Sequence, residues 1–422
     1  MSDFIERQVS RDERQEEAKL KWIKNKCKGT LVQPTGCGKT VTALKCLKTV
    51  VSKYPNLSIL VVVPTDNLKQ QWEIQLEAWN IDANVQVINS VIKNTCSVDI
   101  LVLDETHRYA ASCFARVFEV VKFHYILGLT ATFERVDGRH QIISKYCPVI
   151  DVITVEEALK NGWISEYKEY QVLIDVDDID TYNEYNRQFQ EDFEFFDYDF
   201  SLVMSLLGPQ GFINRSKLRD LRCKDGGDRK AMFTAITHHA TSFMRALQAR
   251  KSFINNHPKK IEIARKIIEA RSDSKIITFS NNIKMAESIG MGGVVYSGKD
   301  SKKKGRITLQ EFESGTYNLI HSICKLNEGA DLKGLSVGIV LGIDSSKIKA
   351  TQKLGRVIRK EGNKQAEMFN IIINGTIETQ WFANSHKNRS YITIDEEGLY
   401  DVLAGKEPKP YNKPIGGFTF RY

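Results

Sequence analysis

Short runs of Val, Ile and Leu alternate with longer amphipathic stretches over the first 150 residues. The run LSILVVVP at residues 57–64 is hydrophobic at nearly every position, as expected for a parallel strand covered on both faces. The stretches Thr40–Lys48 and Asp66–Trp79 favour helices. Alternating βα units predict a doubly wound parallel sheet, with strands at Thr30–Val32, Ser58–Val63, Val85–Ile88, Ile100–Leu103 and Tyr125–Leu129.

A second series of the same kind begins near Lys259. Helices are expected at Ile261–Arg271 and around Arg306–Glu313. The strands expected beside them are Lys275–Phe279, Val294–Tyr296, Leu319–Ser322, Val337–Leu341 and Glu367–Ile373. The predicted fold class is therefore α/β, with two parallel-sheet domains of the same general type.

Two regions break this alternation. The first begins with the polar and aromatic run TYNEYNRQFQEDFEFFDYDF and continues into a long helical stretch, Arg229–Ile254, which predicts a helical insertion over about 178–257. The second region, residues 386–422, has three prolines and two adjacent glycines. We expect it to be irregular, with its last residues, FTFRY, docked on the fold. The predicted units are 1–165 for the first domain, 166–258 for the start of the second domain plus the insertion, 259–385 for the rest of the second domain, and 386–422 for a C-terminal tail.

Length and composition limit the class of protein. A chain of 422 residues suits two to three domains, and a hydrophobic share of 42% allows sizeable cores. No apolar run reaches the ~20 residues that a membrane span needs. The N-terminus, MSDFIERQVSRDERQEEAKLKW, is charged and lacks a signal-peptide core. We therefore expect a soluble, unsecreted protein with no membrane partner.

The eight cysteines are scattered, and they form neither a CxxC pair nor a Cys/His cluster with metal spacing. This pattern is typical of free thiols in a reducing compartment, here the cytoplasm. Cys37 lies inside a glycine-rich segment. Two interpretations stay open for it, a small filler residue, which we favour, and a redox switch.

The net charge of +8 is unevenly distributed. Residues 1–249 have 31 Lys/Arg and 34 Asp/Glu, whereas residues 250–422 have 29 and 18. The positive surplus therefore lies in the second part of the chain. It is consistent with a polyanion partner there, although lysine-rich helix faces are often simply solvated.

The segment QPTGCGKT at Gln33–Thr40 has the composition of a phosphate-binding loop, or P-loop. A predicted strand precedes it and a predicted helix follows it, so backbone amides at the helix start would face phosphate groups. We expect Lys39 to neutralise the β- and γ-phosphates of ATP, and the Thr40 hydroxyl to hold Mg²⁺. The expected ATP-binding residues of the loop are Pro34, Thr35, Gly36, Cys37, Gly38, Lys39 and Thr40.

In LVLDETHR, residues 101–108, two acids end an apolar strand, at the edge where α/β proteins bind ligands. Asp104 is expected to bind Mg²⁺ through water, and Glu105 to orient and deprotonate the attacking water. His107 and Arg108 either relay between the nucleotide and the second domain or form local hydrogen bonds; the two options are equally weighted. Farther along, GLTATFER offers the hydroxyls of Thr130 and Thr132, which are candidates for coupling the acids to the second domain.

Two segments of the second half complete the set. In NEGAD, residues 327–331, Asp331 is a candidate acceptor for a ribose hydroxyl, with an ordinary loop as the alternative. In QKLGRVIR, residues 352–359, Arg356 and Arg359 are three positions apart and share one helix face. They are candidate arginine fingers, which contribute ~10³–10⁵ in rate in other phosphoryl-transfer systems. Two surface arginines are the alternative.

With these five segments in order, residues 10–385 resemble the superfamily 2 helicases of the DExH type. The resemblance implies two RecA-like domains with ATP between them. The family motifs I, Ia, II, III, IV, V and VI match Pro34–Thr40, VVVPTDNLKQQW, Asp104–His107, Thr130–Thr132, Ile277–Ser280, Asn327–Asp331 and Gln352–Arg359. It also implies that Gln15, in RDERQEEA, contacts the nucleobase, and that Gln352 belongs to the catalytic set.

Details of the motifs are similar to those of compact XPB-like and phage UvsW-like DNA helicases. The acidic motif is DETH, TAT continues as FERVDG, and motif VI opens with Gln352 where RNA-directed DEAD-box proteins usually have His. Phe133 replaces the family's proline, and Lys353 replaces a frequent arginine. The compact length is similar to phage-borne members, so a phage protein in a host cytoplasm is one expectation.

The resemblance implies nucleic acid across both domains, opposite the ATP cleft. Pro64, Thr65 and Ser280 would contact its backbone, independently of sequence. The basic cluster Lys302, Lys303, Lys304 and Arg306 would strengthen the hold or is only a solvated loop. The insertion corresponds to a thumb-like element of related enzymes, and its aromatic residues either stack on bases or, as we favour, pack in a helical hairpin.

The predicted function is that of a monomeric, ATP- and Mg²⁺-dependent DNA helicase or translocase that acts on duplex, forked or branched DNA in replication, recombination or repair. RNA is the alternative partner, because the same motifs serve RNA helicases. A third hypothesis is an ATP-gated nucleic-acid clamp without unwinding. A fourth is the translocating subunit of a restriction system, but no nuclease motif is visible in the sequence.

Overall fold

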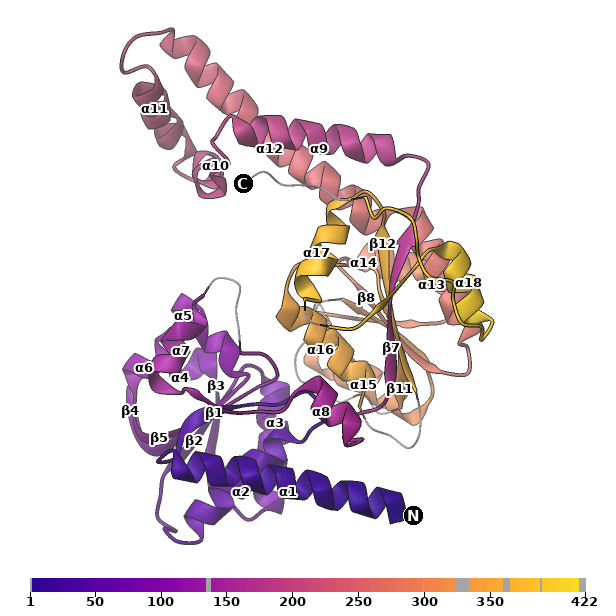
Figure 1. The fold of residues 1–422 in the computed structure, drawn as a ribbon. Coiled ribbons are helices and arrows are strands. Elements are labelled where there is room, and N and C mark those ends of the chain that lie inside the picture. The colour runs from indigo at the N-terminus through magenta and orange to yellow at the C-terminus, as the bar shows by residue number, and fades with distance from the viewer. Residues whose placement is uncertain are drawn as a thin grey trace.

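The computed structural model describes residues 2–133, 138–298, 300–323, 332, 334–359, 365–387 and 389–416, apart from the side chains of residues 2–9, 112 and 302. Two parallel β-sheets, each flanked by helices, form two separate bodies, and a helical arm rises from the second (Figure 1). None of the helices within these residues is long and apolar enough to cross a membrane. The predicted α/β class with two parallel-sheet domains is confirmed.

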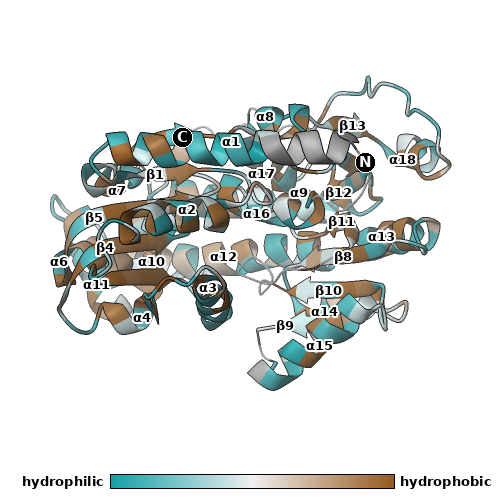
Figure 2. Cartoon of the chain, turned by 90° about the horizontal axis from the view of Figure 1, so that it is seen from below, coloured by the Kyte–Doolittle hydropathy of each residue, from teal (hydrophilic) through white to brown (hydrophobic). Residues whose placement is uncertain are grey.

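Within the described residues, the first sheet has six parallel strands in the order β3-β2-β4-β5-β1-β6. They are β1 (Lys28–Val32), β2 (Ile59–Val63), β3 (Asn84–Val87), β4 (Cys96–Asp104), β5 (Val121–Thr130) and β6 (Val149–Val152). The helices around them are α1 (Ser2–Lys24), α2 (Lys39–Val51), α3 (Asp66–Ala78), α4 (Ile88–Val91), the 3₁₀ helix η1 (Thr106–Ala110), α5 (Ser112–Ala115), α6 (Val117–Val120), α7 (His140–Tyr146) and α8 (Val155–Lys160). Figure 2 shows β4 and β5 largely in the hydrophobic colour, which is expected for strands covered on both faces.

The second sheet, in the part of the chain that the structure describes, has seven parallel strands in the order β13-β7-β12-β11-β8-β10-β9. They are β7 (Tyr167–Ile174), β8 (Lys275–Ser280), β9 (Val294–Ser297), β10 (Leu319–Ile323), β11 (Leu335–Val340), β12 (Ala366–Ile373) and β13 (Ile392–Ile394). Its helices are α13 (Pro258–Ala270), α14 (Ile283–Ile289), α15 (Lys302–Ser314), α16 (Lys347–Val357), α17 (Ile377–Ser385) and α18 (Glu396–Leu403).

The helical arm consists of α9 (Ile179–Glu194), α10 (Phe200–Leu207), α11 (Gly211–Arg222) and α12 (Arg229–Asn256), and we call it the insertion. The helices α9 and α12 lie side by side along its length (Figure 1). Phe189, Phe193 and Phe196 are buried between its helices. These aromatic residues are therefore part of a hydrophobic core, as in the packed-hairpin interpretation. A contact of 2.9 Å between Nε2 of His257 and Oδ1 of Asp178 joins the two ends of the insertion.

Several expectations need correction. The region 386–422 is not irregular throughout, because β13 pairs with β7 and α18 packs on that strand. The strands β6 and β7 were also not expected from the sequence, although β7 pairs over its whole length with β12. The final residues FTFRY lie outside the described residues. Every strand expected from the sequence is present, although the ends of the strands are shifted.

Candidate active site between the two sheets

The candidate site lies at the carboxyl edge of the first sheet. Parallel pairing places Val32 beside Thr130, and Asp104 beside Leu129. The P-loop after β1, the acids at the end of β4 and the TAT residues at the end of β5 therefore leave the sheet side by side. This is the edge at which open α/β sheets bind ligands.

The P-loop has two glycines with left-handed backbone geometry, Gly36 with φ 95° and Gly38 with φ 86°. Gly38 is also the N-cap of α2, so the unpaired amides of that helix start in the loop. The left-handed backbone at Gly38 favours glycine, and a Cβ there would lie 2.5 Å from Nε2 of Gln15, so a larger residue would also displace the end of that side chain. Nζ of Lys39 donates to the carbonyl oxygen of Gln33 at 3.3 Å. An amide-rich turn with an adjacent ammonium group fits a phosphate chain.

The helix α1 covers the P-loop from one side. Gln15 is buried, and its Nε2 donates to the carbonyl oxygen of Cys37 at 3.2 Å. One residue earlier, Arg14 donates from both terminal nitrogens to the two carboxylate oxygens of Asp151, at 3.0 Å each. A bidentate pair of this kind fixes orientation as well as distance. The Arg14–Asp151 pair thus holds α1 at the rotation that directs Gln15 onto the loop.

Asp104 is buried and both of its carboxylate oxygens accept hydrogen bonds. The indole Nε1 of Trp72 donates to Oδ2 at 2.9 Å, and the backbone amide of Glu105 donates to Oδ1 at 2.9 Å. Burial, reinforced by the negative charge of Glu105, raises the pKa of Asp104 to about 6. With both oxygens already engaged, Asp104 is suited to holding a hydrated cation through water.

Glu105 has an unusual backbone, with φ 49° and ψ 54°, in the left-handed region that residues other than glycine seldom adopt. Its Oε2 atom is buried and accepts no hydrogen bond, although Nδ1 of His107 lies 3.4 Å away. Local strain and an unpartnered buried oxygen are features that cluster at functional sites. The carboxylate is thus available to a water molecule in the cleft.

His107 and the two threonines form a local network. Nδ1 of His107 is 3.0 Å from Oγ1 of Thr130, and the Thr130 hydroxyl donates to the carbonyl oxygen of Thr132 at 2.7 Å. The acidic segment and the TAT segment are therefore joined by side chains within the first domain. This contact of His107 is local, and it links His107 to the threonine that is a candidate for coupling to the second domain.

Helix α16 brings the second domain onto the P-loop. A Cβ at Gly355 would lie 2.6 Å from Cβ of Thr35, so the two segments are in close contact. The segment that connects the two domains also contacts the end of this helix. Ser165 donates from its backbone amide to the carbonyl oxygen of Ile358 at 2.8 Å and from its hydroxyl to the carbonyl oxygen of Arg359 at 3.0 Å. Arg356 is 9% exposed, and burial lowers its pKa although the nearby charge of Glu105 opposes the shift.

A cavity of about 600 Å³ lies between these elements. The first domain contributes the P-loop and the two acids, and the second contributes Gln352, Arg356 and Arg359. The residues predicted for ATP binding and catalysis that line this one cavity are Pro34, Thr35, Gly36, Gly38, Lys39, Thr40, Asp104, Glu105, Gln352, Arg356 and Arg359. Segments more than 300 residues apart in the sequence therefore meet.

Gln15 contacts the P-loop without lining the cavity, and Cys37 and Asp331 also stand apart from that group. Cys37 is fully buried in the hydrophobic cluster that also contains Trp163 and Ile164, and burial raises the pKa of its thiol to about 11. A protonated, packed thiol agrees with the filler interpretation and not with a redox switch. Asp331 lies outside the described residues, so the predicted ribose contact stays a prediction.

The residues expected to contact nucleic acid differ in accessibility. Pro64 and Thr65 are half-buried, and the Thr65 hydroxyl accepts a hydrogen bond from the Leu68 amide as the N-cap of α3. Ser280 is buried, and its hydroxyl donates to the carbonyl oxygen of Asn282. Lys303 and Lys304 are exposed at the start of α15, where Lys304 pairs with Asp300. The Lys302 side chain is outside the described part of the chain.

The sequence did not indicate the roles of four residues in or beside the cavity. Trp72 lies on the apolar side of α3, where the sequence pattern predicts a core residue. That pattern gives no sign of the hydrogen bond to Asp104. Arg14 and Asp151 are far apart in the sequence, and no local pattern connects them. Arg11, which lines the cavity from α1, lies in a highly charged stretch where a single arginine is not distinctive.

The fold and the cavity define a two-domain P-loop nucleoside triphosphatase. Two family models match the chain: "Type III restriction enzyme, res subunit" over residues 8–99 and 88–135, and "Helicase conserved C-terminal domain" over residues 259–361. The DNA 3'-5' translocase XPB2 of Sulfurisphaera tokodaii is 27% identical over 386 residues, which cover 86% of this chain and 82% of the relative. The chain belongs to the superfamily 2 helicases and is an ATP-dependent helicase.

Solved structures agree on the fold. The Pyrococcus furiosus Hef helicase domain aligns with a TM-score of 0.54 and 17% identity, over 89% of this chain and 98% of that one. The structure of S. cerevisiae Dbp5 bound to RNA and ADP BeF3 aligns with a TM-score of 0.56 and 11% identity, over 89% and 88%. The two sheets are therefore RecA-like domains.

Proposed function

We propose that the protein is an ATP-driven DNA translocase that remodels duplex, forked or branched DNA during replication, recombination or repair. The observation that carries this proposal is the cavity lined by the P-loop and acids of one domain and by the α16 arginines of the other. A nucleotide in such a cavity links hydrolysis to the separation of the domains. The choice of DNA rests on the similarity to a DNA translocase and on the positive surplus of residues 250–422.

The residues of the cavity fit ATP and Mg²⁺. The P-loop amides and Lys39 would bind the β- and γ-phosphates, and Gln15 would read the base beside the loop. Thr40 and Asp104 would hold Mg²⁺, which needs few protein ligands because phosphate and water complete its shell. When bound, this ion supplies the positive charge that neutralises the phosphates.

In the proposed reaction, Glu105 orients the attacking water and accepts its proton, while Arg356 and Arg359 stabilise charge on the γ-phosphate. Closure of the cleft would bring the arginines into place, and hydrolysis would release them. Alternating hold by the two domains, with backbone contacts from Pro64, Thr65 and Ser280, would then move one strand through the protein, which acts as a monomer. His107, Thr130 and Thr132 would couple the acids to this movement.

Glu105→Gln is the first test of the mechanism. This variant keeps the shape of the side chain but removes its basicity, so we expect ATP and DNA binding to persist while turnover falls at least about 100-fold. Arg356→Ala should also abolish turnover and leave nucleotide binding at the P-loop intact. The two variants would be compared by steady-state ATPase rates and by binding of a fluorescent ATP analogue. Normal turnover in Glu105→Gln would refute the proposed base.

A panel of substrates separates DNA translocation from the alternatives. ATPase and unwinding would be measured on single-stranded, duplex, forked and four-way DNA and on RNA hybrids. Stimulation by forked or four-way DNA together with strand displacement supports the proposal. Stimulation by RNA alone would show an RNA helicase, and DNA-stimulated hydrolysis without displacement or translocation would show an ATP-gated clamp.

A further inference from the structure

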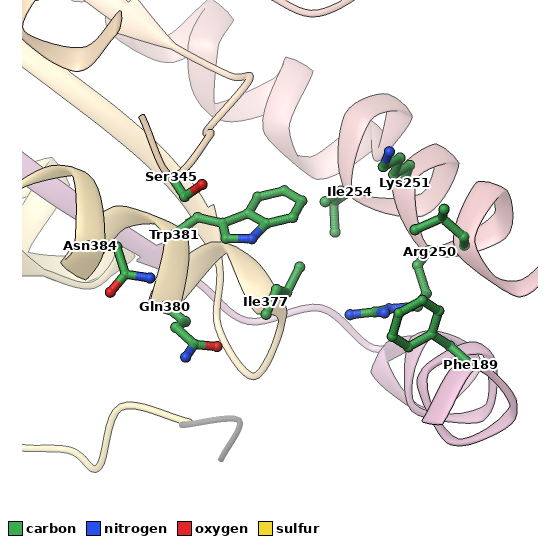
Figure 3. A pocket seen from close by; sticks show the side chains of 10 residues that line it. Phe189, Arg250, Lys251, Ile254, Ser345, Ile377, Gln380, Trp381 and Asn384 are labelled. Carbon is green, nitrogen blue, oxygen red and sulfur yellow. The ribbon is translucent and has the colours of Figure 1, made fainter. Parts of the chain in front are cut away.

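A second cavity, of about 210 Å³, lies where the insertion meets the second domain. Arg250, Lys251 and Ile254 line it from α12, and Ile377, Gln380 and Trp381 line it from α17. Figure 3 shows the Arg250 guanidinium directed from α12 toward Ile377 of α17, with the Trp381 ring between the two helices and the Gln380 side chain on the other side of Ile377 from that ring. The ATP cleft is a separate cavity that shares none of these residues.

Arg250 is an unusual residue for this position, because it is 5% exposed and has no carboxylate partner among the described residues. Its guanidinium carbon lies 4.2 Å from the Phe189 ring centroid, and it also hydrogen-bonds the Tyr182 side chain. Its Nε atom is buried without a hydrogen-bond acceptor. Burial of a charge without a counter-ion is unfavourable, so binding of an anion beside this guanidinium would be favourable.

A second polar group in the cavity is also unsatisfied. Oε1 of Gln380 is buried without a hydrogen-bond donor. The half-buried Trp381 also lines the cavity and offers an aromatic surface, and the buried Ile254 and Ile377 add apolar contacts. An occupant that suits all of these groups has an anion, a flat apolar part and a hydrogen-bond donor on its edge. Phosphate, base ring and base amino group have these properties in a nucleotide.

The cavity is next to the segment expected to contact nucleic acid. The end of β8 continues into Asn281 and Asn282, whose side chains donate to the side chain and carbonyl oxygen of Asn255, respectively. Asn255 directly follows Ile254 of the cavity. Arg250 precedes Asn255 by five residues on α12, which is about one and a half helical turns, so it lies near the loop after Ser280 at the carboxyl edge of the second sheet.

We propose that this cavity binds one nucleotide of the nucleic-acid strand, with its phosphate on Arg250, its base against Trp381 and the base edge at Gln380. This inference rests on the proposed function, because it needs a strand at the carboxyl edge of the second sheet. The insertion and the second domain would then hold the same nucleotide, so binding of the strand would fix the angle between them.

Arg250→Met tests the phosphate contact. Methionine keeps the packing against Phe189 and removes the unpaired charge, so the melting temperature should stay the same or rise. Affinity for a fluorescein-labelled single-stranded DNA oligonucleotide should fall about tenfold or more, and the slope of log affinity against log salt should decrease by about one. Basal ATPase without DNA should not change.

Arg187→Met is the matched control, because Arg187 lies on the exposed side of α9 and pairs with Glu184 and Glu191. Trp381→Leu tests the stacking surface independently, with an expected loss of about fivefold or more in affinity. If Arg250→Met and Trp381→Leu both bind the DNA oligonucleotide with the affinity of the wild-type protein, the inference is overturned. Failure of the wild-type protein to bind DNA or RNA at all would instead refute the proposed function.

Discussion

At the scale of single residues, the candidate site depends on side chains whose role is to orient others. Asp104 is held from both sides, by Trp72 and by the Glu105 amide. Gln15 reaches the P-loop because Arg14 is fixed to Asp151. The sequence identifies Asp104, Glu105 and Lys39 because short motifs contain them. It does not identify Trp72 or Arg14, because their partners are remote in sequence and become neighbours only in the folded chain.

Trp72→Phe removes the indole donor to Asp104 and keeps most of the buried ring. Groups that orient a metal-binding carboxylate typically contribute 10–100-fold to metal affinity or activity. We therefore expect the Mg²⁺ concentration for half-maximal ATPase activity to rise about tenfold or more, with little change in melting temperature.

Trp22→Phe is the control for this change, since its indole donates to the carbonyl oxygen of Ile126 at 3.0 Å, at a buried position of the same domain outside the cavity. An equal shift in the Mg²⁺ requirement of both variants would contradict a specific role for Trp72.

At the scale of elements, burial on both faces made most strands predictable, but β7 shows the limit of that signal. The strand β7 contains Glu169 and Gln171, which interrupt its apolar pattern, and yet both are buried. Glu169 contacts Nε2 of His386 at 3.1 Å, and Gln171 accepts from the Thr393 hydroxyl at 2.9 Å. Because residues 217 and 222 positions away satisfy these polar groups, no local pattern could predict the strand.

A buried ion pair joins α13 to α17 in the same way. Nζ of Lys260 donates to Oε1 of Glu378 at 2.6 Å, and both side chains are fully buried. Lys260→Met leaves the carboxylate buried without its partner, which typically costs about 3–5 kcal/mol of unfolding free energy. Lys259→Met is the matched control, because this neighbour is partly exposed and surface pairs contribute about 0–1 kcal/mol.

The loss of unfolding free energy in Lys260→Met should also depend on pH. Burial raises the pKa of Glu378 above its ordinary value, and Lys260 opposes that rise. Without Lys260 the pKa rises further, so the protonated, neutral carboxyl is favoured in the folded state. Stability is then retained at low pH and lost as pH rises through the folded pKa. Urea unfolding of Lys260→Met and wild type should therefore differ less at pH 4 than at pH 7, and an equal difference at both would contradict this account.

At the scale of the whole molecule, the two halves of the chain differ in charge and in the site residues that they contain. The positive surplus lies entirely in residues 250–422, whereas the P-loop and the acids lie in the first half. If the second half holds a polyanion mainly by charge, affinity depends on the release of counterions. The two-domain plan was predictable because the βα pattern occurs twice, but the close approach of Gly355 to Thr35 was not.

Raising salt from 50 to 200 mM should therefore weaken DNA binding at least about tenfold. Fluorescence anisotropy with labelled duplex DNA measures this change. Basal ATPase activity should vary little over the same range, because the ATP cleft lies between the domains and its charges are partly buried. Binding that is insensitive to salt would show that contacts to bases or apolar surface dominate.

The two hydrogen bonds from Ser165 to the end of the QKLGRVIR segment have a geometric consequence. They fasten the connection between the domains to the segment that ends in Arg359, so a pivot at this point moves the nearby arginines through a short arc. The insertion is a long lever attached to the far side of the second domain (Figure 1). If the second domain rotates about Ser165 during the ATP cycle, the displacement is therefore largest at the tip of the insertion.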